Sequence, residues 1–139
     1  MLISKAERGF TLIEVVVSLG IFALIFSGAL AVKLSEERLA NWNSTTRDNL
    51  TYLEAVRGIM VESMTYSDIL DLKNTGRVYI CVEDPAVYNF TAARPDRVSY
   101  ISMRIIEGPV IEVEMELHQY AFGKTEIFGS KFFKGKYKR

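Results

Sequence analysis

Residues 8–33 read RGFTLIEVVVSLGIFALIFSGALAVK, and this apolar stretch decides how the rest of the chain is arranged. Within it, residues 10–32 form a run of 23 residues with a single ionisable side chain, that of Glu14. A helix of this length rises about 34 Å, which is enough to cross a hydrocarbon core of about 30 Å. The sequence therefore predicts a membrane-spanning helix over residues 10–33.

A short polar leader, residues 1–9, precedes the apolar stretch. It carries Lys5 and Arg8, which the positive-inside rule places in the cytoplasm. The residues that follow the apolar run of residues 10–32, beginning with Lys33, contain no small-residue cleavage site of the kind that ends a secretory signal. We therefore expect the apolar helix to stay attached to the mature protein, with the residues from 34 onward outside the cytoplasm.

Glu14 is unusual because a carboxylate inside a membrane helix is costly, by up to about 2.5–3.5 kcal/mol at the helix centre. It lies four residues after Phe10. If the chain were cut between Gly9 and Phe10, the new α-amine would stand one helical turn from this carboxylate, at the positive end of the helix dipole. A cut at this point would therefore give the charge of Glu14 a partner.

The string Gly9-Phe10-Thr11-Leu12-Ile13-Glu14, after a short basic leader, resembles the processing site of type IV prepilins and type II secretion pseudopilins. In that family a membrane peptidase cleaves after the glycine and methylates the new terminal amine, and the glutamate helps to align the subunit in a filament. The resemblance implies cleavage between Gly9 and Phe10, N-methylation at Phe10 and an assembly role for Glu14. The string over residues 14–22 resembles minor pilins and minor pseudopilins more than major ones.

The same resemblance implies a function, partners and a location. The function is that of a structural subunit in a type IV pilus-like or type II secretion pseudopilus filament, as a minor or initiating component. A filament of a competence system is also consistent with the resemblance. The partners are prepilin peptidase, other pilins or pseudopilins, an inner-membrane assembly platform and membrane lipid. The location is the inner membrane, as a single-pass protein with a cytoplasmic N-terminus, and then a periplasmic or extracellular filament.

Two alternatives remain open. One is a pilin-like DNA-uptake or adhesion module that uses the basic C-terminal tail, residues 131–139, where aromatic residues are interleaved with cations as in surfaces that bind single-stranded nucleic acid. The cations are Lys131, Lys134, Lys136, Lys138 and Arg139. A solvated tail, or a contact with the next subunit, explains the same charges. The other alternative is an uncleaved single-span membrane protein with a small sensor domain, whose mature chain would begin at Met1.

Two features depart from the pattern of the family. Many pilins close a C-terminal loop with a disulfide, but Cys81 is the only cysteine, so no intrachain disulfide can form and the domain must be held by packing. Many pilins also have a proline in the apolar helix, which this chain lacks. Ser27-Gly28 is the place where we consider a kink or a melted segment.

The remaining residues, 34–139, predict an extracytoplasmic α+β domain. Over residues 34–72 apolar side chains recur at spacings of three and four, so we expect an amphipathic continuation of the apolar helix. Its apolar stripe consists of Leu39, Trp42, Leu50, Leu53, Val56, Met60 and Met64. Residues 74–97 read as a variable connecting loop with a short strand at 78–82. Within the loop, Tyr88 and Phe90 are either exposed anchors or tucked beneath it, and burial tendencies favour the second.

Residues 98–133 predict a small antiparallel sheet. Residues 100–106 and 110–117 alternate in polarity around the turn Glu107-Gly108-Pro109, which is typical of a hairpin. A third strand is expected over 125–133, interrupted at Gly129, with its lysines opposite a stripe of glutamates. The stripe consists of Glu112, Glu114 and Glu116. The other face of the sheet would pack on the helix through Ile101, Met103, Ile105, Ile111, Val113 and Met115, which gives the pilin-like architecture that the resemblance also implies.

The sequence predicts a protein that is not an enzyme. His118 is the only histidine and Cys81 the only cysteine, and neither has the spacing of a metal site or of a nucleophile–base pair. We interpret His118 as a surface residue at a strand end and Cys81 as a small strand residue. No metal and no other cofactor is predicted.

Overall fold

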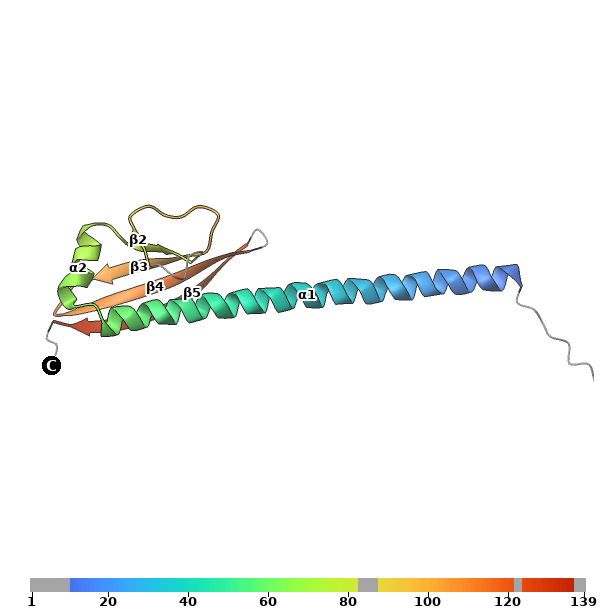
Figure 1. Cartoon of the computed structure of the whole chain (residues 1–139), viewed down its shortest axis with the longest axis horizontal. Coiled ribbons are helices and arrows are strands. Elements are labelled where there is room, and N and C mark those ends of the chain that lie inside the picture. Colours follow the sequence, from blue (N-terminus) through green and yellow to red (C-terminus); the bar gives the residue numbers. More distant parts are fainter. Residues whose placement is uncertain (1–10, 83–87, 122–123, 137–139) are drawn as a thin grey trace, which may run out of the picture. The chain divides into compact units, whose positions relative to one another are not determined.

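The computed structural model describes residues 11–82, 88–121 and 124–136 (Figure 1). The predicted leader (1–9), Phe10 and the two cations Lys138 and Arg139 lie outside the described residues. The chain separates into two compact units, residues 1–41 and residues 42–139, which are taken in turn below.

The first unit contains the N-terminal part of helix α1, Leu12–Glu62. Its apolar side chains are exposed, as Leu24 illustrates at 74%. By length and composition the helix is able to cross a membrane. It stays helical through Ser27 and Gly28, where a kink or a melted segment was considered. Leu39, which was expected in the apolar stripe, is 62% exposed, so its assignment to the domain core was wrong.

The second unit packs the rest of α1 on a five-stranded antiparallel sheet (Figure 1). The strands are β1 Tyr79–Cys81, β2 Phe90–Thr91, β3 Tyr100–Ile106, β4 Val110–Ala121 and β5 Lys124–Gly135. Their order in the sheet is β2-β1-β3-β4-β5, and each neighbouring pair is antiparallel. The predicted α+β class, a long N-terminal helix on a small antiparallel sheet, is confirmed.

One hydrophobic core joins α1 to the inner face of the sheet. All the predicted sheet residues are buried in it, namely Ile101, Met103, Ile105, Ile111, Val113 and Met115. From α1 the predicted Leu53, Val56 and Met60 are buried as well. Tyr52 and the fully buried Gln119 join this interface without having been predicted; the amide nitrogen of Gln119 donates to the hydroxyl of Thr46 at 3.0 Å. Burial of this apolar surface is the main favourable contribution to the fold.

The single helix predicted over 34–72 is two helices, so that prediction was wrong. α1 ends at Glu62, and α2 spans Tyr66–Asn74. Thr65 is the N-cap of α2: its hydroxyl accepts from the backbone N–H of Asp68, and the carboxylate of Asp68 accepts from the N–H of Thr65 at 2.7 Å. This reciprocal capping box satisfies the first backbone donors of a new helix. The hydrogen bonds from Thr65 also hold the pKa of Asp68 below its ordinary value of 3.8.

The connecting region over residues 74–97 contains more structure than was predicted. Gly76 adopts a left-handed backbone conformation (φ 68°), which a glycine tolerates at the turn that leads from α2 towards β1. The two-residue strand β2 pairs with β1 and was not foreseen. Phe90 packs against the core, while Tyr88 is 37% exposed and stacks on Tyr52 with ring centroids 5.5 Å apart. Phe90 therefore follows the favoured interpretation, whereas Tyr88 is exposed, as the alternative expected.

The third predicted strand is longer and more regular than expected. β5 is continuous through Gly129, which lies opposite Glu116, so the predicted interruption was wrong. A glycine weakens a strand but keeps both of its backbone hydrogen-bonding groups, and the long β4 offers a partner on either side of it. As a consequence Lys131 and Lys134 lie in a strand and not in a tail.

We expect Thr65→Ala to lower the free energy of unfolding by about 1 kcal/mol, because it removes the N-cap of α2. Urea titration of the full chain in detergent, followed by near-ultraviolet circular dichroism, measures this change. Ser63→Ala is the matched control, since Ser63 is an exposed neighbour outside the capping box. Equal stability of Thr65→Ala and Ser63→Ala would show that the cap does not stabilise this unit.

Candidate functional site

The start of α1 holds the first predicted site. The N–H of Thr11 donates to Oε2 of Glu14 at 3.2 Å, and the Thr11 hydroxyl donates to the same oxygen at 3.3 Å. In return, the N–H of Glu14 donates to the Thr11 hydroxyl oxygen at 3.4 Å. These contacts form a capping box at the end of the helix where backbone donors lack intrahelical partners. Thr11 is a site residue that the sequence interpretation missed, although the T-x-x-E spacing was present to reveal it.

The capping box holds the carboxylate of Glu14 at the N-terminal end of α1. Its carboxylate lies against the backbone nitrogen of Thr11, the residue that directly follows Phe10. Gly9 and Phe10 themselves lie outside the described residues, so cleavage and methylation there stay predictions. A carboxylate in the first turn also interacts favourably with the helix dipole.

The part of α1 over residues 15–34 presents an exposed surface, which none of the described residues buries. None of the residues 15–34 is buried. A methyl group added at Gly20 or Gly28 would meet no atom within 4 Å. Small residues allow other helices to approach closely in an apolar medium. This surface is therefore suited to contact with lipid or with further apolar helices.

The second predicted site, the basic C-terminal tail, is divided between the two faces of the sheet. Because side chains alternate along a strand, Lys131 and Phe133 share the face away from α1, while Phe132 and Lys134 belong to the face that packs on it. Lys136 is exposed beyond the end of β5, and Lys138 and Arg139 lie outside the described residues. The predicted interleaving of aromatic and basic residues therefore does not form a single surface over residues 131–134.

Lys131 and Lys134 of β5 both have partners within the domain. Nζ of Lys131 is 2.7 Å from a carboxylate oxygen of Glu112 and 3.9 Å from one of Glu114, so the predicted pairing with the glutamate stripe is confirmed for this lysine. The hydrogen bond that Lys131 donates to Glu112, followed by the negative charge of Glu112, raises the pKa of Lys131 above the ordinary 10.5. Nζ of Lys134 donates to the backbone carbonyl of Val61, in the last turn of α1.

His118 is not the strand-end surface residue that was expected. Its ring is half-buried, and it stacks on Tyr100 with centroids 4.6 Å apart and planes inclined by 12°. Its Nε2 atom lies 3.0 Å from the hydroxyl of Ser102 and 3.6 Å from the carboxylate of Glu116. The strand register explains the stacking, because Tyr100 and His118 are directly opposite each other on β3 and β4.

Cys81 is half-buried in β1, as expected for a small strand residue. Among the described residues, no group of three or more histidine, cysteine or acidic side chains is arranged to hold a metal ion.

The comparisons with known proteins concern the N-terminal part of the chain. Residues 4–30 match the family model described as the prokaryotic N-terminal methylation motif. The searches of curated proteins and of solved structures gave no significant match. The match contains Gly9, Phe10, Thr11 and Glu14, the residues of the first site, and ends before the β-sheet unit.

We expect Glu112→Gln to lower the pKa of Lys131 towards 10.5, since the hydrogen bond with this carboxylate is the main cause of the raised value. A pH titration of the lysine side-chain signals by NMR measures the change. Glu116→Gln is the control, because Glu116 is on the same face of β4 and its carboxylate approaches His118. A Lys131 pKa that is the same in Glu112→Gln as in the wild-type chain would contradict the pairing.

Proposed function

We propose that this chain, which carries the N-terminal methylation signature of type IV pilins and pseudopilins, is a structural subunit of a type IV pilus-like or type II secretion pseudopilus filament. The observation that carries the proposal is the motif at residues 4–30. The pilin-like layout of a long N-terminal helix on an antiparallel sheet supports it. Within the filament we assign the chain to the minor or initiating components, following the resemblance of residues 14–22.

In this proposal the leader is removed at the membrane. Lys5 and Arg8 keep residues 1–9 on the cytoplasmic side, while the apolar part of α1 spans the bilayer. Prepilin peptidase then cleaves the Gly9–Phe10 bond and methylates the amine of Phe10. The mature protein is thus a membrane-anchored subunit that is ready for assembly.

The new amine of Phe10 would carry a positive charge near neutral pH, since an α-amino group has a pKa of about 7.7–8.0. It would stand next to Thr11, whose N–H donates to Glu14. The opposite charges of the amine and the carboxylate would reduce the cost of keeping Glu14 in apolar surroundings. The capping box at the start of α1 therefore supports the proposal that cleavage gives the carboxylate of Glu14 its counter-charge.

Assembly would exchange lipid for protein around the first half of α1. The exposed apolar side chains of residues 12–34 and the open positions at Gly20 and Gly28 fit both environments. Other pilins or pseudopilins would provide the neighbouring helices, and an inner-membrane assembly platform would deliver them. The proposed role is structural, with no reaction assigned to the chain.

The two alternatives have less support. A DNA-uptake or adhesion role for the basic tail is weakened because Lys131 and Lys134 already have partners on opposite faces of the sheet. An uncleaved single-span protein would still form the Thr11–Glu14 capping box, so this contact by itself does not favour processing. The family motif favours processing, and sequencing of the mature N-terminus tests processing directly.

We expect the chain made together with a prepilin peptidase to begin at Phe10 and to carry one added methyl group. Intact mass spectrometry and N-terminal sequencing, on chains made with and without the peptidase, measure where the mature chain begins and whether it carries the methyl group. Gly9→Val should leave the chain uncut, whereas the control Gly20→Ala, which changes an open helix position, should be processed normally. A wild-type chain that still begins at Met1 in the presence of the peptidase would overturn the proposal.

We expect Glu14→Gln to be processed but to be largely lost from filaments. Glutamine can still accept a hydrogen bond from Thr11, so the substitution removes the charge and leaves the cap geometry nearly intact. The measurement is the ratio of this chain in sheared filaments to that in membranes. Glu36→Gln is the control, because Glu36 is an exposed carboxylate of the same helix, 3.9 Å from Lys33. If both variants entered filaments as well as the wild type does, Glu14 would have no assembly role.

A further inference from the structure

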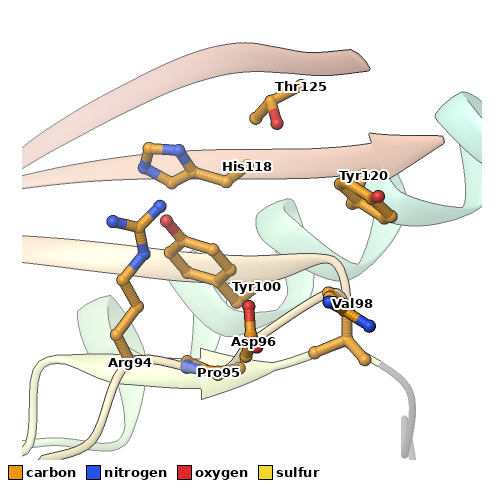
Figure 2. A pocket seen from close by; sticks show the side chains of 9 residues that line it. Arg94, Pro95, Asp96, Val98, Tyr100, His118, Tyr120 and Thr125 are labelled. Atoms are coloured by element: carbon orange, nitrogen blue, oxygen red, sulfur yellow. The ribbon is translucent and has the colours of Figure 1, made fainter. Parts of the chain in front are cut away.

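The face of the sheet that is turned away from α1 carries a pocket of about 510 Å³ (Figure 2). Its walls come from residues 94–98, the start of β3, the end of β4 and the start of β5. This volume lies within the range of about 300–1,000 Å³ that is typical of small-molecule sites. The pocket is part of the second unit alone, and the proposed filament function makes no use of it.

The floor of the pocket is a fixed pair of flat rings. Tyr100 is 6% exposed and stacks on His118, and the ring of Tyr79 packs against Tyr100 at 6.0 Å in an edge-to-face arrangement. The hydrogen bond between His118 and Ser102 restrains the second ring. In Figure 2, Tyr120 lies on the side of Tyr100 opposite Arg94, and Thr125 lies above the rings. Both rings are mostly buried, so a planar group that enters the pocket would meet only the small accessible part of this fixed pair.

Two arginines from the loop line the same pocket. The guanidinium carbon of Arg94 lies 5.4 Å from the centre of the Tyr100 ring, and Figure 2 shows this group beside the tyrosine hydroxyl and the histidine ring. Arg97 has a left-handed backbone (φ 59°), which is uncommon for a residue other than glycine and is a type of strain that clusters at binding sites. In the part of the chain that the structure describes, neither guanidinium forms an ion pair, although the carboxylate of Asp96 also lines the pocket (Figure 2).

These features define the chemistry of a ligand. A guanidinium presents a planar fork of donors that matches the two oxygens of a carboxylate or the oxygens of a phosphate. Beside it, the accessible part of the Tyr100–His118 pair offers an aromatic contact. We propose that this pocket binds a small organic anion in which a carboxylate or phosphate group is attached to a planar ring. Arg94 and Arg97 bind the oxyanion, and the ring lies against Tyr100 and His118.

The test is a titration of the isotopically labelled full chain in nonionic detergent, followed through the ring signals of Tyr100 and His118. Benzoate and phenyl phosphate are the probes, and the tighter of the two identifies the preferred oxyanion. Benzyl alcohol has the planar ring without the anionic group, and inorganic phosphate has the anionic group without the ring. We expect saturable shifts with benzoate, phenyl phosphate or both. Benzyl alcohol and inorganic phosphate should bind more weakly.

Substitutions separate the pocket from general attraction by charge. Arg94→Gln and Arg97→Gln should each weaken binding of the better probe by roughly tenfold, as expected when a hydrogen bond to a charged group is lost. Arg104→Gln is the matched control, because Arg104 is an exposed arginine on the same face of the sheet, 3.9 Å from Glu114 and outside the pocket. Near-ultraviolet circular dichroism confirms that each variant is folded.

Three results would overturn the proposal. The first is the absence of saturable shifts at Tyr100 and His118 with both benzoate and phenyl phosphate. The second is an equal loss of affinity in Arg104→Gln, which would indicate non-specific attraction. The third is binding of benzyl alcohol as tight as that of benzoate, which would show that the arginines do not recognise an anion.

Discussion

The structure depends on one constraint, which is that a single helix has to satisfy two different surroundings. Over residues 15–32, α1 is mainly apolar and none of its side chains is buried by the described residues, whereas over its second half only one face is buried, through Leu53, Val56 and Met60. In an apolar medium backbone groups have to be satisfied within the chain, so a helix is the favoured form there. Its first turn is the weak point, and the Thr11–Glu14 capping box supplies acceptors at that position.

Patterns of short period allowed the main elements to be predicted from the sequence. The apolar stretch, the stripe on the second half of α1 and the alternation in β3 and β4 each reflect a repeat that burial imposes directly. The core face of the sheet followed from the same alternation, and all six of its predicted residues are buried. At the candidate processing site, the family resemblance pointed to Gly9, Phe10 and Glu14, but the hydrogen bonds that position Glu14 needed the geometry of Thr11.

The predictions that were wrong depended on competing local signals or on strand register. The helical spacing of apolar residues continues past Glu62, so the T-x-x-D box at Thr65 was read as helix interior. Gly129 was treated as a strand breaker, although the length of β4 keeps β5 paired beyond it. The stacking of Tyr100 on His118 could not be read from a linear sequence, because it requires the register that places residues 18 positions apart opposite each other. For the same reason, the sequence suggested one basic surface at the C-terminus, whereas the alternation of side chains along β5 places Lys131 and Lys134 on opposite faces of the sheet.

The contact between Lys134 and Val61 links the beginning and the end of the domain. The last carbonyl groups of a helix lack intrahelical donors, and α1 has no basic residue of its own in its last turn. That donor comes from a lysine 73 positions later in the chain. During synthesis on the ribosome, α1 therefore emerges long before the strand that completes its C-terminal end. A nascent chain that stops short of β5 would lack both the edge strand of the sheet and this helix cap. The domain is therefore complete only when β5 has been synthesised.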